Sequence, residues 1–204
     1  MDFAGFIFVP KSPRRLDLTA AGEIIPVVRE GIRRVGVFAD ENPARVKELA
    51  RTFRLDVLQF HGEESPEYCR QFGYPYFKTI RVRRYLRPES LKGYRPECFL
   101  LDTFSAAAPG GTGESFDWSI AIEVRERGFP VLLAGGLTPN NVSEAVRRVR
   151  PWGVDVCSGV ESAPAVKDHH KMRAFVQAAR HKTWSPTSIN RGGTLHGERS
   201  RTIT

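Results

Sequence analysis

The chain has 204 residues, 31 Lys and Arg against 23 Asp and Glu (net charge +8), and 41% hydrophobic residues. This length and apolar content exclude a mainly disordered protein and suit one domain with a substantial core. Three cysteines without a CxxC or Cys/His pairing disfavour a disulfide framework or structural zinc. Since no apolar run approaches the roughly 18 residues of a membrane helix, we expect a cytoplasmic protein with no membrane partner.

The basic residues are spread through every segment of the chain. Proteins that bind nucleic acids usually concentrate basic charge on one face or element. We therefore predict no nucleic-acid partner. A net positive field instead favours a small anionic substrate such as a phosphorylated carboxylate.

Short apolar runs alternate with helical patterns along the chain. The runs have little polar alternation, which predicts strands buried on both faces of a parallel sheet. They cover residues 3–8, 34–38, 56–60, 76–81, 98–102, 130–134 and 154–157. Helices are predicted at 19–29, 42–53, 65–72, 117–126, 141–149 and 168–182, with a weaker pattern at 86–92 that contains Pro88. Thr19, Pro43 and Ser65 are start signals for the first three of these helices.

The alternation of strand and helix predicts an α/β fold with a parallel sheet, either a closed barrel or a doubly wound layer. An eight-unit barrel takes about 200 to 250 residues, and we count seven units in residues 1–182. Residues 183–204 have no periodicity and few apolar side chains. We predict that this segment is a disordered basic tail.

Two glycine-containing segments follow the last two predicted strands. Gly135 and Gly136 follow one strand, and Cys157, Ser158 and Gly159 follow the next. Paired loops of this kind favour a phosphate site, because glycine lets backbone N–H groups approach an anion. The alternative is that the glycines only permit tight turns. Neither segment has the spacing of a nucleotide P-loop.

Three further side chains follow predicted strands. Asp102 ends an apolar strand, where a carboxyl group can act as a general acid or can cap a turn. The glycine-rich segment 104–116 after it is long enough for a mobile lid. Arg14 could hold a carboxylate or belong to a solvated turn, and His61 could contact substrate or be structural.

Several segments together resemble the phosphoribosylanthranilate isomerase family. They are GFIFVPKSPRR, VGVFADENP, VLQFHGEESPEYC, FLLDT followed by GGTGESFDW, LLAGGLTPNNV and GVDVCSGVESAPAVKD, within residues 2–180. The resemblance implies a TIM (β/α)8 barrel and an isomerase of tryptophan biosynthesis. Its reaction is the Amadori rearrangement of N-(5-phosphoribosyl)anthranilate to 1-(2-carboxyphenylamino)-1-deoxyribulose 5-phosphate. The resemblance implies no cofactor, no metal and a monomer or homodimer.

The resemblance also implies roles for individual residues. Asp102 matches the general acid that protonates the furanose oxygen, and Arg14 matches the residue that holds the anthranilate carboxylate. His61 and Asp155 match substrate-binding positions whose roles are less defined. The phosphate positions are Gly135, Gly136, Cys157, Ser158 and Gly159. Cys157 stands where the family commonly has Ser.

One family motif is not found in these residues. Family members open with a strand carrying Lys-Ile-Cys-Gly, whose Cys is the general base, and the 204 residues contain no such motif. We therefore expect the first βα unit to be missing, which would leave two strand edges unpaired. Three explanations stay open: a start codon assigned too late, a true truncation, or a degenerate relative that only binds a phosphosugar.

Two alternatives to the isomerase assignment follow. One is a truncated or degenerate phosphosugar-binding barrel without isomerase activity, and the other is a different phosphosugar isomerase or lyase on a related barrel. A separate hypothesis places Cys157 near the position of the family's base, because it follows Asp155 by two residues in the last strand.

Overall fold

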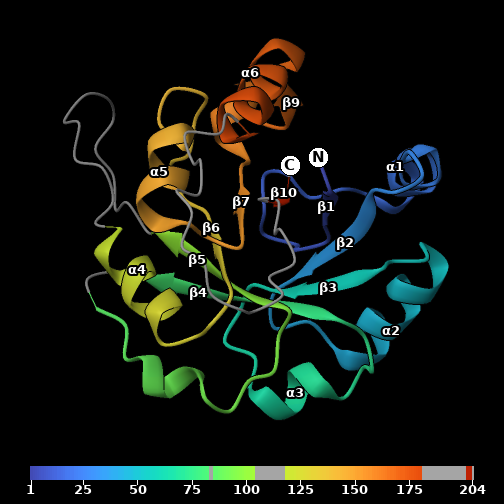
Figure 1. The fold of residues 1–204 in the computed structure, drawn as a ribbon. Coiled ribbons are helices and arrows are strands. Elements are labelled where there is room, and N and C mark those ends of the chain that lie inside the picture. Colours follow the sequence, from blue (N-terminus) through green and yellow to red (C-terminus); the bar gives the residue numbers. More distant parts are fainter. Residues whose placement is uncertain (83–84, 104–117, 181–200, 204) are drawn as a thin grey trace.

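Eight parallel strands form a closed barrel in the computed structural model, which describes residues 1–82, 85–103, 118–180 and 201–203 (Figure 1). The order around the barrel is β1, β10, β7, β6, β5, β4, β3 and β2. Their bounds are β1 Phe3–Ile7, β2 Arg33–Phe38, β3 Val57–Phe60, β4 Tyr76–Val82, β5 Cys98–Thr103, β6 Val131–Leu133, β7 Gly153–Asp155 and β10 Arg201–Ile203. All seven predicted strands are present, and the predicted barrel is confirmed.

The helices alternate with the strands along the chain and lie on the outside of the barrel (Figure 1). They are α1 Leu18–Ile24, α2 Pro43–Thr52, α3 Pro66–Arg70, α4 Ser119–Glu126, α5 Val142–Val149 and α6 His169–Arg180. The weak pattern at 86–92 forms only a 3-10 turn, Pro88–Leu91. After β7, a 3-10 turn at Ser158–Val160 leads into a small antiparallel hairpin of β8 (Glu161–Ala163) and β9 (Val166–Lys167).

The helix starts follow the predicted cap chemistry in two cases and differ in one. Ser65 caps α3 by accepting a hydrogen bond from the Tyr68 N–H at 3.2 Å, and Pro43 begins α2. The predicted start of α1 at Thr19 is wrong. Asp17 caps this helix instead, because its carboxylate accepts a hydrogen bond from the Ala20 N–H at 2.9 Å.

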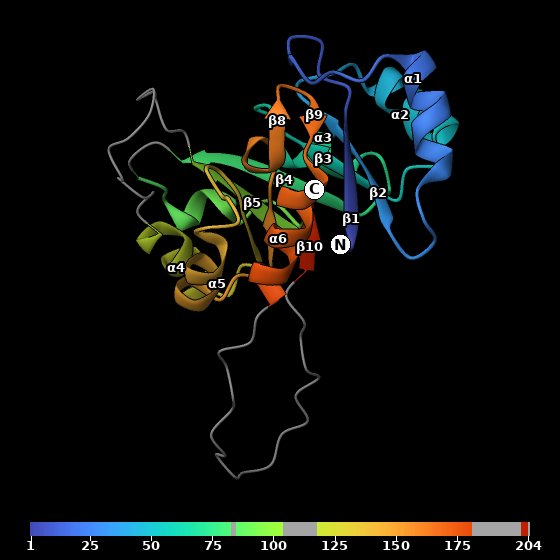
Figure 2. The ribbon, with the colours of Figure 1, turned by 90° about the horizontal axis from the view of Figure 1, so that it is seen from above.

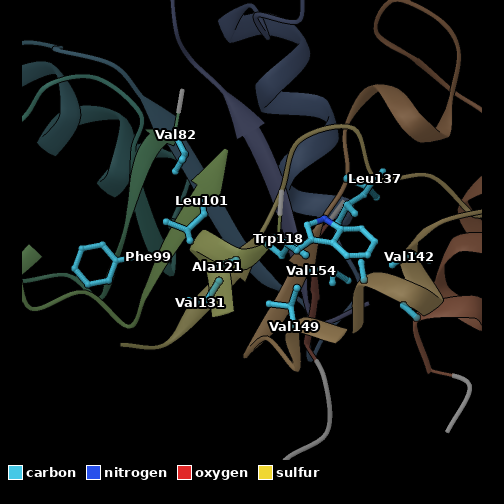
Figure 3. Close-up of a cluster of buried hydrophobic side chains, with 14 of the residues drawn as sticks. Val82, Phe99, Leu101, Trp118, Ala121, Val131, Leu137, Val142, Val149 and Val154 are labelled. Atoms are coloured by element: carbon cyan, nitrogen blue, oxygen red, sulfur yellow. The ribbon is translucent and has the colours of Figure 1, made fainter. Parts of the chain in front are cut away.

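The core is divided between the barrel interior and the space under the helices. Alternate residues of each strand face these two regions. The interior contains Phe3, Val35, Val57, Phe77, Cys98, Leu100, Leu132 and Ala134. The outer layer under α4, α5 and α6 includes Phe99, Leu101, Trp118, Val131, Val142, Val149 and Val154 (Figure 3). Alternation along each strand therefore shows which residues near the site point into the barrel and which point toward the helices.

The strand β10 closes the barrel between β1 and β7. Ile203 pairs with Phe3 of β1, and Arg201, Thr202 and Ile203 pair with Gly153, Val154 and Asp155 of β7. Figure 2 shows β10 beside β1, with the two ends of the chain close together. The predicted disordered tail is therefore wrong for Arg201–Ile203, and so is the expectation that β1 and β7 keep unpaired edges. Residues 181–200 and 204 lie outside the described residues.

Removing residues 181–204 is expected to destabilise the barrel, because β1 and β7 then lose their shared neighbour. At about 1 kcal/mol for each backbone hydrogen bond lost, the free energy of unfolding should fall by about 2–4 kcal/mol. Chemical denaturation of the full and shortened chains measures this difference. Thr202→Pro, which removes one backbone N–H from the middle of β10, should be destabilised relative to Thr202→Ala. Equal stability of the full and shortened chains would refute a structural role for β10.

Candidate active site

Polar side chains meet at the carboxyl ends of the barrel strands because they share the inward-facing positions. Leu100 faces the barrel interior, so Asp102, two residues later on β5, faces the same way. Val154 of β7 packs in the outer layer, which turns its neighbour Asp155 inward. The same alternation along β3 directs His61 inward. This places the three predicted residues Asp102, Asp155 and His61 at one mouth of the barrel.

His61 and Asp102 approach one another across this mouth. The His61 Nε2 atom lies 3.6 Å from Oδ2 of Asp102, and both side chains are partly exposed. Burial lowers the pKa of His61 even though the negative charge of Asp102 opposes that shift, while Arg81 and Lys78 add to it. A neutral imidazole beside a carboxyl group can carry or relay a proton without adding a fixed positive charge to the site.

Asp155 is the group in the mouth with the most strongly perturbed acidity. Burial, followed by the negative charge of Asp102, raises the pKa of Asp155 to about 7, and Lys167 opposes this shift only in part. A carboxyl group that is buried beside another negative charge retains its proton at a pH where an exposed one would have lost it. Asp155 therefore holds a proton near neutral pH, next to Asp102.

The raised pKa of Asp155 predicts a pH-dependent stability. Its ordinary value is 3.8, so between pH 4 and 7 the folded state binds more protons than the unfolded state, and stability falls as pH rises through this window. Asp155→Asn mimics the protonated group and should gain stability relative to the natural chain as pH rises from 4.5 to 8.5. Urea unfolding at both pH values measures this, with the exposed Glu30→Gln as the control. A stability difference independent of pH would contradict the expected shift.

A cavity of about 300 Å³ opens beside these residues. Aliphatic side chains form much of its wall, whereas cationic groups and an imidazole provide the polar part. It is lined by Ile7, Val9, Lys11, Ser12, Val37, Ala39, His61 and Arg81. Such a wall suits a flat apolar ring that carries a negative substituent, because the ring packs on the aliphatic groups and the charge meets Lys11 or Arg81.

The two predicted phosphate loops are in close contact and have a defined backbone. Gly135 and Gly136 adopt φ values of 79° and 65°, which side chains disfavour. A Cβ on Gly159 would lie 1.9 Å from the carbonyl oxygen of Leu137, so the loop after β7 approaches the loop after β6 only because position 159 is glycine. The loops after β6 and β7 therefore form one continuous surface at the barrel mouth.

Asn141 holds the loop after β6 in shape. Its Oδ1 accepts a hydrogen bond from the Thr138 N–H at 2.8 Å, and its Nδ2 donates to the Gly136 carbonyl at 3.0 Å. These bonds fix the turn that contains Gly136. A preformed backbone of this kind is what an anion site requires. The predicted phosphate role remains a proposal.

Arg14, predicted to hold a carboxylate, is paired with a protein carboxylate. Its guanidinium donates through Nε to Oε1 of Glu161 at 2.8 Å and through Nη2 to Oε2 at 2.6 Å. The alternative of a solvated turn is wrong, because the Arg14 side chain is 26% exposed and donates hydrogen bonds to Glu161 through two of its three guanidinium nitrogens. Lys167 also approaches Glu161, with Nζ 3.4 Å from Oε1.

Cys157 lies next to this pair. Its Sγ atom is 3.8 Å from Oε1 of Glu161 and 3.8 Å from Nζ of Lys167. Burial raises the pKa of the Cys157 thiol, although Lys167 and Arg14 oppose that shift. A thiol that holds its proton is a poor general base, so the surroundings of Cys157 do not favour the hypothesis that it acts as one.

A buried ion pair between Lys78 and Glu64 holds the backbone of the loop that follows β3. Nζ of Lys78 donates to Oε2 of Glu64 at 2.9 Å and to the Gly62 carbonyl at 2.6 Å. Oε1 of Glu64 accepts from the N–H groups of Gly62 and Asp40 at 3.0 and 2.9 Å. The Lys78 and Glu64 side chains are 3% and 1% exposed. The pair thus fixes the backbone immediately after His61.

Arg81, Glu161 and Lys167 are site residues that the sequence motifs do not predict. The inward alternation along β4, from Phe77 through Thr79, could have placed Arg81 in the cavity. No local signal predicts the pairing of Glu161 with Arg14, which is 147 residues away. The predicted lid at 104–116 lies outside the described residues. Within those residues, no group of three or more His, Cys, Asp or Glu could hold a metal ion, and no helix is long and apolar enough to span a membrane.

Comparisons with known proteins agree with this geometry. A family described as N-(5'phosphoribosyl)anthranilate (PRA) isomerase matches residues 1–178. An N-(5'-phosphoribosyl)anthranilate isomerase of Trichlorobacter lovleyi is 45% identical over 179 residues, covering 88% of this chain and 87% of the relative. The crystal structure of phosphoribosyl anthranilate isomerase from Thermotoga maritima has a TM-score of 0.77 and 37% identity, with 87% of each chain covered.

A further solved structure bears on the ligand. It is phosphoribosyl anthranilate isomerase in complex with reduced 1-(o-carboxyphenylamino)-1-deoxyribulose 5-phosphate. It matches this chain with a TM-score of 0.74 and 36% identity, and 87% of each chain is covered. The residues matched by the family end before β10.

Proposed function

Because the chain belongs to the N-(5'-phosphoribosyl)anthranilate isomerase family, we propose that the mouth of its barrel divides the reaction among three groups of residues. The reaction is an isomerisation in tryptophan biosynthesis. It converts N-(5-phosphoribosyl)anthranilate, a substrate with a carboxylate at one end and a phosphate at the other. The net charge of +8 favours the approach of such an anion.

The first group performs proton transfer, and the approach of Asp102 to His61 and Asp155 is the observation that carries the proposal. A proton from Asp102 passes to the furanose ring oxygen while the bond from that oxygen to C1 breaks. As this bond breaks, the nitrogen lone pair forms the C1–N double bond of the protonated Schiff base. The neutral imidazole of His61 accepts the C2 proton, which leaves an enol with a C1–C2 double bond, and a proton added at C1 converts this enol to the ketone of the product. Asp155 keeps a proton available beside Asp102, because burial and the negative charge of Asp102 raise the pKa of Asp155 to about 7.

The second group binds the anthranilate end. The aliphatic wall of the cavity accepts the aromatic ring. Arg14 does not line this cavity, but its backbone N–H donates to Oγ of the lining residue Ser12 at 3.2 Å, and its guanidinium provides hydrogen bonds and positive charge to the carboxylate in addition to the charge of Lys11 and Arg81. Although Glu161 occupies Nε and Nη2 of Arg14, a guanidinium has more N–H groups than one carboxylate can accept. Arg14 therefore retains donors for a second carboxylate.

The third group binds the phosphate. Backbone N–H groups of Gly135 and Gly136, together with those of Cys157, Ser158 and Gly159, face an anion where the two loops meet. The positive φ values and the contact at Gly159 support this assignment, because they keep the backbone accessible without side chains in the way. A backbone donor at Cys157 needs no hydroxyl group, so the cysteine fits a position where serine is common.

The experiment that tests the function uses the 204-residue chain. Turnover of N-(5-phosphoribosyl)anthranilate is followed spectroscopically, and binding of reduced 1-(o-carboxyphenylamino)-1-deoxyribulose 5-phosphate is measured by calorimetry. We expect turnover and one binding site. Binding without turnover would support the alternative of a phosphosugar-binding barrel. The absence of both binding and turnover would overturn the assignment of the site.

A further inference from the structure

The pair of Arg14 and Glu161 joins two distant parts of the chain above the barrel. Arg14 lies in the loop between β1 and α1, whereas Glu161 begins β8 after the phosphate loop of β7. Both oxygens of Glu161 engage Arg14, at 2.8 Å to Nε and 2.6 Å to Nη2. A bidentate pair of this kind fixes the plane of the guanidinium as well as its position.

Glu161 is itself held by its surroundings. Its side chain is only 5% exposed, and Lys167, which is opposite it in the β8–β9 hairpin, approaches Oε1 to 3.4 Å. Nζ of Lys167 also donates to the Cys157 carbonyl at 2.9 Å, and Nζ of Lys171 on α6 donates to the Glu161 carbonyl at 2.8 Å. Lys167 thus connects the side chain of Glu161 to the loop after β7, and Lys171 holds its backbone to α6. Glu161 is therefore a fixed support for Arg14.

The charges of the group remain favourable for an anionic substrate. Arg14 and Lys167 are positive and Glu161 is negative, so the three side chains together keep a positive charge. The hydrogen bonds from Arg14 lower the pKa of Glu161 to about 2, which keeps it ionised at any pH at which the enzyme would be assayed. Glu161 consequently orients the guanidinium without neutralising the whole group.

We propose that Glu161 is a positioning residue that holds one edge of Arg14 so that its remaining N–H groups point to the anthranilate carboxylate. The inference rests on the proposed role of Arg14. Because the phosphate loop and Glu161 belong to the same segment after β7, this pair also sets the separation between the carboxylate and phosphate ends of the substrate. The competing possibility is that Glu161 occupies the carboxylate site and must be displaced by substrate.

The test is a double-mutant cycle on steady-state kinetics with N-(5-phosphoribosyl)anthranilate. Glu161→Gln should raise KM about 10- to 100-fold, the usual worth of hydrogen bonds between charged groups, and change kcat less than about threefold. In the Arg14→Ala background the same substitution should leave KM unchanged. Glu161→Asp keeps the charge but shortens the side chain. It should raise KM by less than Gln does, and it tests the placement if the Gln variant does not fold.

A matched control is available at the other end of the barrel. Glu97 forms a similar bidentate pair with Arg33, at 2.8 and 3.0 Å, where β2 begins. Glu97→Gln should leave KM unchanged, which separates positioning of Arg14 from the loss of any Arg–Glu pair.

Three results would overturn the proposal. A lower KM in Glu161→Gln would identify Glu161 as a competitor of the substrate carboxylate. An equal rise in KM on Glu161→Gln with and without Arg14, or a KM of Glu161→Asp equal to that of the unsubstituted chain, would show that Glu161 does not act by positioning Arg14. An unchanged KM in Arg14→Ala alone would instead refute the proposed role of Arg14, so that the two failures are distinguishable.

Discussion

Replacement of Asp102 by Asn is expected to lower kcat by about 10²- to 10⁴-fold, the usual contribution of a positioned proton donor. The amide keeps the size of the side chain at the end of β5 but cannot release a proton to the ring oxygen. KM should change little, because the bound substrate does not yet hold that proton. Steady-state kinetics with N-(5-phosphoribosyl)anthranilate measures both constants.

The control for this substitution is Asp56→Asn. Asp56 precedes β3 at the opposite end of the barrel, where it accepts hydrogen bonds from the backbone and side chain of Arg34 at 2.7 and 3.1 Å. Its substitution should leave kcat unchanged. A kcat of Asp102→Asn within about threefold of the natural value would contradict the assignment of Asp102 as the proton donor.

Replacement of Lys78 by Met is expected to reduce the free energy of unfolding by about 3–5 kcal/mol, since it leaves the buried charge of Glu64 without its cation. The Lys78 ammonium also donates to the carbonyls of Phe60 and Thr79, at 3.4 and 3.2 Å, and these lose their partner too. Denaturant unfolding measures the change. The expected cost is large because both side chains are excluded from solvent.

Two variants separate the charge effect from general damage. Adding Glu64→Gln to Lys78→Met removes the uncompensated charge and should restore part of the lost stability. Lys92→Met at an exposed position should be nearly neutral. If the double variant is no more stable than Lys78→Met alone, the buried charge is not the cause of the loss.

Much of the barrel could be predicted because its signals are local. The apolar runs correspond to β1 through β7 within one or two residues, since a strand buried on both faces needs a continuous run of such residues. Ser65 and Pro43 predict helix starts because capping also depends only on neighbouring residues. Asp17 was missed in favour of Thr19 because both residues can cap a helix and only the folded backbone decides between them.

The site was predicted in part. Asp102, Asp155 and His61 end strands of known direction, so their meeting at one mouth follows from the barrel and from alternation along each strand. The engagement of Arg14 with Glu161 does not follow, because no periodicity connects two loops that are 147 residues apart. Arg81 could have been found by extending the alternation along β4 by one further step.

The sequence by itself determined the order of strands and helices, the glycine turns and the family, because these depend on neighbouring residues or on whole motifs. Only the tertiary structure decided how the barrel closes and which charges pair. Arg201–Ile203 is too short and too polar to predict as a strand, yet it becomes one because β1 and β7 present backbone groups that need partners. Likewise, Glu161 becomes part of the site only because the loops after β1 and β7 meet above the barrel.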